Sequence, residues 1–190
     1  MLRTYNLTME EHFILYTEMS HPDVSPYVRN YVNDFNEYIS NVNHILEAEN
    51  RGEMIVRVIV NEWNRPIGLI TLYDITEYGG FLSTWLGKDY HGSGYNKVAK
   101  ELFFNDIFDT TEIQTVFMKI RVDNYRSQKA ALKLAYVAEA DYRYQAVHTF
   151  VNQTVFKYNL YTVTKQAYLA DQKVRQVDYV TSDSEIQLSI

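Results

Sequence analysis

The spacing of hydrophobic residues predicts an amphipathic helix over residues 34–52. Apolar side chains recur there every three or four positions, which places them on one helical face: Phe35, Tyr38, Ile39, Val42, Ile45 and Leu46. Asp34 and Glu37 have the spacing of an N-cap residue and its third helical partner, and Gly52 follows the expected end.

A shorter strand and helix are expected before it. The segment LRTYNL has the alternation of a strand, and Thr8 and Glu11 then have capping-box spacing at the start of TMEEHFILYTEM. Two prolines in SHPDVSPY end that helix.

Beyond residue 53 the pattern becomes strand-like. MIVRVIV and PIGLITLYDIT are joined by turn residues, which predicts a hairpin, and GGFLSTWLG is a third such run. SGYNKVAKELFFNDIF then predicts a helix whose apolar face is formed by Val98, Ala99, Leu102, Phe103 and Ile107. A further strand, IQTVFMKIRV, and a short helix, SQKAALKLAYV, follow.

The last third of the chain predicts more strand and a terminal helix. HTFVNQTVFKYNLYTVT has the composition of a strand or hairpin, and the final 25 or so residues suit a helix with a loose tail. This order of elements predicts a mixed α/β domain around a central sheet. We expect one domain over residues 1–165, with residues 166–190 as its C-terminal extension.

Composition narrows the possible functions. The chain has 190 residues, 46% hydrophobic and 22% charged, which suits one globular domain. Its net charge is −6 and its 18 Lys and Arg form no long basic run, so a nucleic-acid partner is not expected. Neither a signal peptide nor a membrane-length apolar run is apparent, so we expect a cytoplasmic protein without a membrane partner.

Metal chemistry is not expected either. There are no cysteines, which excludes disulfides and thiolate ligands. The histidines His12, His21, His44 and His148 have no histidine three or four positions away, so a zinc site is not predicted. We expect Trp63 and Trp85 to pack rather than bind a ligand.

Two glycines stand where a strand must turn into a helix. In WLGKDYHGSGYNKVAKEL, Gly92 and Gly94 precede a helix whose first amides have no intrahelical partners, so an anion can approach them directly. The Walker A pattern fails because no Gly-Lys-Ser/Thr follows at the needed distance. The dinucleotide fingerprint fails because Lys97 occupies the place of its third glycine.

The same segment resembles the acetyl-CoA pyrophosphate loop of the GNAT superfamily of N-acetyltransferases, written Gln/Arg-x-x-Gly-x-Gly/Ala. The residues His91-Gly92-Ser93-Gly94-Tyr95-Asn96 occupy this motif and keep its central glycine, Gly94, and the preceding Trp-containing strand is similar to the ribosomal-protein (RimJ/RimL-like) branch. Downstream, VDNYRSQKAALKLAYV is similar to that branch's Asn-x-Arg-Ser stretch. The resemblance covers roughly residues 1–165 and implies a mixed, mostly antiparallel twisted sheet flanked by helices.

The resemblance implies a direct transfer of acetyl from acetyl-CoA to an amine. It implies that acetyl-CoA binds the segment from His91 to Asn96. It also implies contacts with Trp85 and Leu86 at the strand end and with Asn124 and Ser127 in the downstream stretch. In that family the amide at Leu86 polarises the acetyl carbonyl, and Ser127 is the candidate proton donor to the leaving thiolate. Ser127 is also a good helix N-cap, and both roles remain open.

The general base and the acceptor pocket are less defined. Phe81 and Leu82 occupy the region where the branch often carries Glu, so Asp74, Glu77, Tyr78 or a water relay are alternatives. Tyr27, Arg29, Asp74 and Glu77 are the candidate acceptor-site residues, although each also suits an ordinary surface role.

Two functions remain open. The first is an acetyl-CoA-dependent N-acetyltransferase acting on a small-molecule amine or a protein N-terminus. The second is a non-catalytic acyl-CoA-binding or regulatory module, favoured by the departures from the family pattern at His91, Asn96 and Val98. Homodimerisation through the late strands or the C-terminal extension is a further hypothesis.

Overall fold

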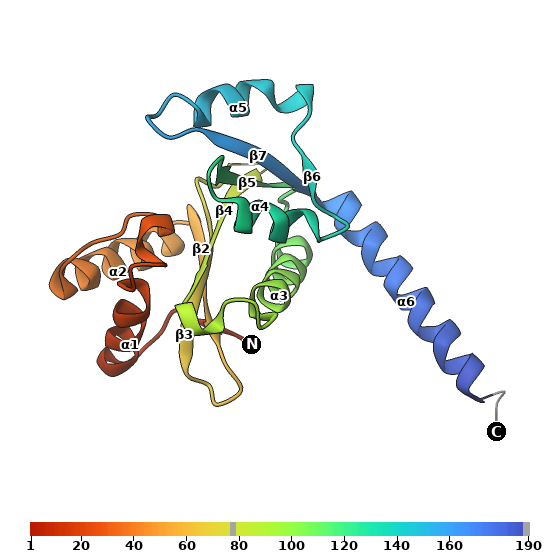
Figure 1. The fold of residues 1–190 in the computed structure, drawn as a ribbon, viewed down its shortest axis with the longest axis horizontal. Helices are drawn as coiled ribbons and strands as arrows, with labels where there is room; N and C mark the ends of the chain where they lie inside the picture. The colour runs from red at the N-terminus through yellow and green to blue at the C-terminus, as the bar shows by residue number, and fades with distance from the viewer. Residues whose placement is uncertain (77–78, 188–190) are drawn as a thin grey trace. The chain divides into compact units, whose positions relative to one another are not determined.

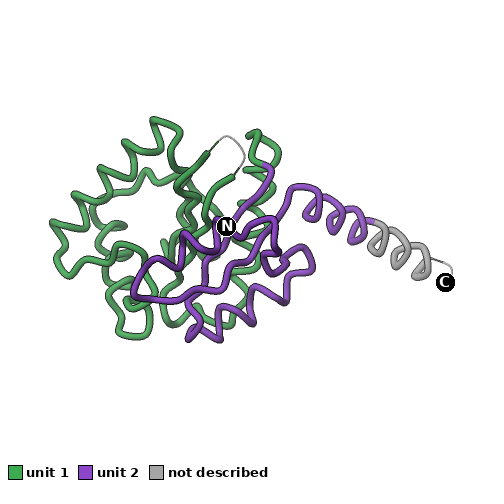
Figure 2. The backbone as a smooth tube through the Cα atoms, turned by 90° about the horizontal axis from the view of Figure 1, so that it is seen from above, with its two compact units in different colours: residues 1–113 green, residues 114–190 purple. Residues whose placement is uncertain are grey.

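The computed structural model describes residues 1–76 and 79–187, with side chains of the last helix described as far as residue 176. The chain divides into two compact units, residues 1–113 and 114–190 (Figure 2). Strand pairs within each unit are antiparallel, and helices accompany both sets of strands (Figure 1). The expected mixed α/β fold with a mostly antiparallel sheet is therefore confirmed.

The first unit is a four-stranded antiparallel sheet in the order β1-β2-β3-β4. Its elements in chain order are β1 Leu2–Thr4, α1 Met9–Met19, the 3-10 turn η1 Ser25–Tyr27, α2 Phe35–Asn50, β2 Met54–Val60, β3 Pro66–Tyr73, β4 Gly79–Leu86, the 3-10 turn η2 Lys88–Tyr90 and α3 Tyr95–Thr110. Within this unit α1 and α2 cover one face of the sheet and α3 covers the other (Figure 1).

The local signals predict where the first two helices begin. The Thr8 hydroxyl accepts from the Glu11 amide, and the Glu11 carboxylate accepts from the Thr8 amide, which forms the expected capping box. The Asp34 carboxylate accepts from the amides of Asn36 and Glu37 and so caps α2. These side chains satisfy amides that have no partner inside the helix.

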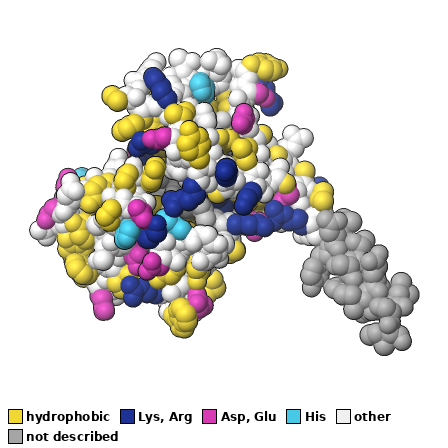
Figure 3. Space-filling view, viewed as in Figure 1, with side chains coloured by type: hydrophobic (Ala, Val, Ile, Leu, Met, Phe, Trp, Pro, Cys, Tyr) yellow, Lys and Arg dark blue, Asp and Glu magenta, His cyan; other side chains and the backbone are white. Residues whose placement is uncertain are grey.

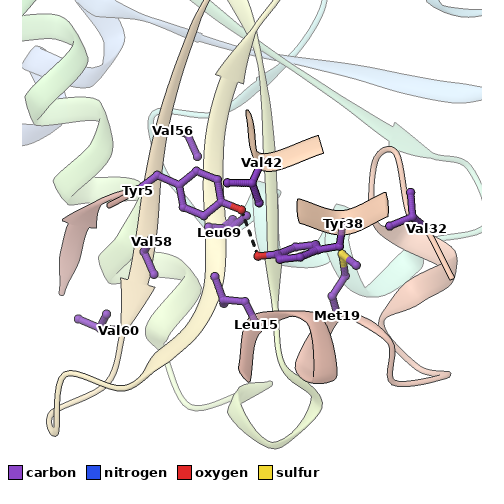
Figure 4. Close-up of a cluster of buried hydrophobic side chains, with 10 residues drawn as sticks. All are labelled: Tyr5, Leu15, Met19, Val32, Tyr38, Val42, Val56, Val58, Val60 and Leu69. Atoms are coloured by element: carbon purple, nitrogen blue, oxygen red, sulfur yellow. Dashed lines mark hydrogen bonds between the residues drawn. The ribbon is translucent and has the colours of Figure 1, made fainter. Parts of the chain in front are cut away.

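The core between α1, α2 and the sheet contains a buried polar contact (Figure 4). Alternate residues of β2 point toward these helices, and the cluster comprises Tyr5, Leu15, Met19, Val32, Tyr38, Val42, Val56, Val58, Val60 and Leu69. The hydroxyls of Tyr5 and Tyr38 lie 3.1 Å apart, and Nδ1 of His12 lies 3.3 Å from the Tyr38 hydroxyl. Pairing of these polar atoms offsets the cost of burying them.

The apolar face of α3 differs from the one the sequence pattern suggests. Val98 and Leu102 are 50% and 40% exposed, whereas the buried residues of the helix are Ala99, Lys100, Phe103, Phe104, Ile107 and Phe108. The expectation that Val98 and Leu102 share the buried face is therefore wrong. Phe104 and Phe108 are buried in place of Val98 and Leu102, so the buried face of α3 is rotated and includes Lys100.

Arg57 of β2 joins the helical layers on the two sides of this sheet. Its guanidinium donates to Glu49 of α2 at 3.0 Å and to Asp106 of α3 at 3.1 Å. The same Glu49 oxygen accepts from the Val56 amide at 3.0 Å. The pairing of β1 with β2 ends at Thr4 and Arg57, so Glu49 supplies an acceptor to β2 just beyond the end of β1.

The second unit has β7 paired with both β5 and β6. Its elements are β5 Thr115–Arg121, α4 Tyr125–Leu132, β6 Ala138–Glu139, the 3-10 turn η3 Tyr142–Tyr144, α5 Gln145–Val151, β7 Tyr158–Thr164 and α6 Lys165–Gln187. Inside it, the rings of Tyr136 and Tyr168 meet edge to face with centroids 5.0 Å apart. This contact packs the start of α6 against the segment that follows α4.

The expected strand or hairpin over residues 148–164 is only half correct. Residues 158–164 form β7, but residues 145–151 form α5. The Asp141 carboxylate accepts from the Arg143 amide and starts the turn, and the Asn152 side chain closes it by bonding His148 O and both backbone groups of Tyr158. Side-chain bonds to the backbone at both ends outweigh the strand preference of the residues between them.

Candidate active site

The loop before α3 leaves its backbone amides open to an anion. Gly92 and Gly94 have φ values of +79° and +86°, and a Cβ at either position would meet nothing within 4 Å. Gly94 is the N-cap residue of α3, and no side chain caps the helix. The Gly94 carbonyl accepts from the amides of Lys97 and Val98, so those two are satisfied within the helix. The amides of the preceding residues and the positive end of the helix therefore suit a phosphate.

Two buried side-chain oxygens of the first unit have no protein partner among the described residues. They are Oδ1 of Asn96, in the first turn of α3, and Oγ1 of Thr84, in β4. Thr84 lies two residues before Leu86, so both side chains lie on the same face of β4. A buried polar atom without a partner points to an absent ligand or water, and an amide oxygen and a hydroxyl suit the amides and hydroxyls of the coenzyme A arm.

The backbone of Leu86 faces the edge of β4 away from β3. The Gly87 amide donates to Ile67 O at 2.8 Å, and Gly68 pairs with Leu86. Successive residues of a strand direct their amides and carbonyls to alternate edges, so the Leu86 groups point opposite to those of Gly87. An amide in this direction can donate to a carbonyl that lies alongside β4.

His91 fixes the end of that strand. Its Nε2 lies 2.9 Å from the Leu86 carbonyl oxygen. A carbonyl only accepts, so Nε2 carries the proton. His91 stands where the family pattern has Gln or Arg, and like them it donates a hydrogen bond.

Two further glycines admit close approaches at the same strand end. A Cβ at Gly68 would lie 2.2 Å from the Trp85 carbonyl oxygen, which belongs to the backbone. A Cβ at Gly87 would lie 2.2 Å from Oε2 of Glu18. At Gly68 the neighbour is backbone, whereas at Gly87 it is the end of the flexible Glu18 side chain, which can move. β3 and the Glu18 carboxylate thus both lie directly against the end of β4.

Glu18 is the acidic group that sequence reasoning missed. It is in the last turn of α1, its side chain is 19% exposed, and Arg65 Nη2 lies 3.7 Å from its Oε1. Burial raises the pKa of the Glu18 carboxyl and Asp89 raises it further, whereas Arg65 and His21 oppose the shift. The sequence does contain one signal for an unusual role of Glu18. An acidic residue in the last turn of a helix is unfavourable, because it lies at the negative end of the helix dipole.

The expected acceptor-site residues are partly brought together. Arg29 lies over the Tyr73 ring at 3.6 Å, and its Nη2 is 3.9 Å from Oδ1 of Asp74. Tyr27 in η1 is 45% exposed. Glu77, together with Tyr78, lies outside the described residues. Arg29 therefore has a ring and an acid beside it, which leaves its charge partly neutralised.

In the second unit, Asn124 rather than Ser127 caps α4. The Asn124 side-chain oxygen accepts from the Ser127 amide at 3.1 Å, so Ser127 is the third residue of the helix. The interpretation of Ser127 as the N-cap is wrong, because Asn124 is already in the cap position. The neighbouring Gln128 donates to Arg121 O at 3.0 Å and Val122 O at 2.9 Å, and so fixes the start of α4.

The expected packing of the tryptophans is correct for one of them. Trp85 packs against the core cluster of the first unit. Trp63 is 79% exposed in the turn between β2 and β3, so its expected packing is wrong.

Figure 3 shows acidic and basic side chains mixed with hydrophobic ones over the surface formed by α1 and α2.

The described part of the chain contains neither a metal-binding group of side chains nor a membrane-spanning helix. Across residues 1–76 and 79–176, whose side chains the structure describes, no group of three His, Asp or Glu side chains is placed to hold a metal ion. In the same part of the chain, no helix has the length and apolarity needed to cross a membrane.

A family model decides what this arrangement belongs to. Residues 2–137 match the model described as the acetyltransferase (GNAT) domain. This chain belongs to the GNAT acetyltransferase family. The matched residues include the glycine loop, the end of β4 and α4, and proteins of the GNAT family use acetyl-CoA. A search of curated proteins finds no match to this GNAT sequence.

Solved structures share the fold. A nucleotide-linked sugar GNAT, FdhC, in its apo form has a TM-score of 0.69 at 15% identity, covering 94% of this chain and 92% of that one. Spermidine N-acetyltransferase from Vibrio cholerae with CoA and spermine has a TM-score of 0.69 at 13% identity, covering 89% and 97%. The microcin C7 self-immunity acetyltransferase MccE with acetyl-CoA and AMP has a TM-score of 0.63 at 17% identity, covering 83% and 88%.

Proposed function

We propose that this GNAT protein is an acetyl-CoA-dependent N-acetyltransferase that moves acetyl directly to a primary amine of a small molecule or a protein N-terminus. The observation that carries the proposal is the uncapped start of α3, where Gly92 and Gly94 leave open space in front of the helix amides. The resemblance to the RimJ/RimL-like branch, which rests on the two sequence stretches, supports the N-acetyl assignment.

The residues of the chain have separate roles in this proposal. The amides from Gly92 to Asn96 hold the pyrophosphate, and the Thr84 hydroxyl and Asn96 amide contact the coenzyme A arm. The Leu86 amide donates to the acetyl carbonyl oxygen, where negative charge develops during transfer. Acetyl-CoA supplies the activated acetyl thioester. Asn124 orders the start of α4, so that Ser127 is held in one orientation as the proton donor to the departing thiol.

The cations of α4 support the binding of an anionic cosubstrate. Arg126 and Lys129 lie in this helix and Lys133 follows it, while the helix contains no acidic residue. Three positive charges within about two helical turns provide a field that attracts phosphate groups.

Calorimetry with a matched pair of variants tests cosubstrate binding. Gly94→Asp places a carboxylate in front of the α3 amides, so titration with acetyl-CoA or CoA should give no heat. Gly52→Asp is the control, because Gly52 also has a positive φ, +74°, and nothing within 4 Å of its Cβ position. Binding that survives Gly94→Asp, or that is lost equally in Gly52→Asp, contradicts the assignment of the loop.

A thiol-release assay separates catalysis from binding alone. The panel should contain polyamines and nucleotide-linked amino sugars, which follow the names of two fold relatives, and peptides with free N-termini, which test the second proposed acceptor class. CoA release with any of them excludes the non-catalytic acyl-CoA-binding module. Tight binding without release from the whole panel favours that module, which the departures at His91, Asn96 and Val98 also suggest.

A further inference from the structure

The Glu18 carboxylate lies against the backbone at the end of β4. Its Oε2 would lie 2.2 Å from a Cβ at Gly87, the residue that directly follows Leu86. The absence of a side chain at Gly87 lets the Glu18 carboxylate approach the backbone in this position. The contact links the last turn of α1 to the strand end at which the proposed function places the acetyl carbonyl.

Three other acids of the first unit are less suited to exchange a proton with an amine bound at this strand end. Asp74 has a side chain that is 62% exposed and lies beside Arg29. Asp23 forms an ion pair with Lys88. Asp89 is exposed in η2. Glu18 combines a mostly buried carboxylate with a distant cation, Arg65 at 3.7 Å, so it is not fully neutralised.

We propose that Glu18 takes the proton from the acceptor ammonium group before the amine attacks the acetyl carbon. This inference rests on the proposed N-acetyltransferase function and names the base that the function requires. It also gives α1 a direct role in acceptor recognition, because a carboxylate at this place favours an amine that arrives as a cation.

The proton and bond balance is complete without a further reactant. One proton moves from the ammonium nitrogen to Glu18, which leaves a neutral amine with a free lone pair. The new C–N bond forms as the C–S bond of the thioester breaks. The nitrogen loses a second proton to water and the thiolate gains one, which yields an amide, CoA thiol and an ionised Glu18 after the carboxyl releases its proton.

The surroundings of Glu18 suit this role at neutral pH. Burial and the negative charge of Asp89 hold its pKa above the ordinary value, while Arg65 from the β2–β3 turn and His21 after α1 limit the rise. Lys88 of η2 and Asp23, which follows α1, form an ion pair with each other. A base whose pKa is closer to the working pH accepts and releases protons more readily.

Kinetic profiles of four variants test the assignment. Glu18→Gln should lower kcat by at least about 100-fold, with the heat of CoA binding unchanged. Glu10→Gln, on an exposed residue of the same helix, should match the wild type. Asp89→Asn should move the acid limb of the pH–rate profile to lower pH, and Arg65→Gln should move it to higher pH, because each removes one influence on the Glu18 pKa.

Thermal unfolding separates a base from a structural ion pair. A carboxyl whose folded pKa is raised destabilises the fold at pH values above that pKa, so Glu18→Gln should raise Tm at pH 7.5. If the Glu18–Arg65 pair instead holds α1 in place, Glu18→Gln lowers Tm, and the assignment is overturned. It is also overturned if kcat persists in Glu18→Gln, or if the acid limb stays fixed in both neighbouring variants. If the wild type shows no turnover, the proposed function itself is overturned. If the wild type turns over but Glu18→Gln lowers Tm or keeps its kcat, or the acid limb stays fixed, only the assignment of Glu18 is overturned.

Discussion

Nε2 of His91 donates to the Leu86 carbonyl across 2.9 Å, and this bond ties the glycine loop to the end of β4. The two backbone groups of Leu86 therefore have different roles: its carbonyl is used inside the protein, while its amide is the donor assigned to the acetyl group. The loop that is expected to hold the pyrophosphate and the strand that is expected to hold the acetyl carbonyl are thus coupled by one side chain.

Removing the His91 donor should affect transfer more than cosubstrate binding. His91→Phe keeps the bulk but loses a bond worth about 0.5–1.5 kcal/mol, so the end of β4 should loosen and kcat should fall about 10-fold. His91→Gln restores a donor and should recover most of kcat. The CoA thiol-release assay measures both, and equal kcat for His91→Phe and wild type would show that the bond has no part in positioning Leu86.

Gly68→Ala should destabilise the first unit by about 1–3 kcal/mol, because the added Cβ would lie 2.2 Å from the Trp85 carbonyl oxygen and two backbones would have to separate. Gly80→Ala is the matched control in β4. Its Cβ would meet only the Leu72 side chain at 3.0–3.3 Å, which can move. Urea denaturation compares the two free energies of unfolding, and a smaller loss for Gly68→Ala than for Gly80→Ala would contradict the backbone clash.

Lys100→Met should stabilise the protein at pH 7. Lys100 is 7% exposed, and burial lowers its pKa from 10.5 to about 8. This lowering of the pKa corresponds to a cost of about 3 kcal/mol for keeping the Lys100 side chain charged in the folded protein. Because the unfolded chain binds the proton more tightly, this cost is full below pH 8 and disappears as pH rises toward 10.5.

Denaturation of Lys100→Met at pH 7 and pH 10 measures this dependence. Lys97→Met is the control, because Lys97 is exposed in the same helix and should leave the free energy of unfolding nearly unchanged. A gain for Lys100→Met that is the same at both pH values would mean that packing rather than charge is responsible.

The buried His12 should make the fold sensitive to acid. Burial lowers its pKa below the ordinary 6.5, so the unfolded chain binds a proton that the folded chain resists. Stability from this group is therefore complete above pH 6.5 and is lost as pH falls below it. In His12→Leu the free energy of unfolding should decline less steeply between pH 6.5 and lower values. His44→Gln, on an exposed side chain, should keep the wild-type slope.

Short-range signals in the sequence predict the elements better than the contacts between them. The capping box at Thr8 and Glu11 and the cap at Asp34 depend on residues within three positions, and both are confirmed. The positive φ at Gly92 and Gly94 follows from the same local requirement for a strand to turn into a helix. These features need no knowledge of the rest of the fold.

The wrong predictions depend on tertiary packing or on competing polar side chains. Val98 and Leu102 have helical spacing but are exposed, because Phe104 and Phe108 fill the buried face instead. Ser127 suits an N-cap in isolation, but Asn124 occupies that position. Glu18 approaches Gly87 from a distant part of the chain, and no local pattern predicts such a contact.

Mutation of Arg57 should disturb the first unit more than mutation of either acid that pairs with it. One guanidinium serves as the common counter-ion for Glu49 and Asp106, which belong to helices on opposite faces of the sheet. Losing either acid leaves a balanced pair, whereas losing the arginine leaves two half-buried carboxylates without their shared cation. Natural variation should therefore be tolerated more readily at residues 49 and 106 than at residue 57. Losing one acid also changes the ion pair of the other, because Arg57 is shared between the two helical layers.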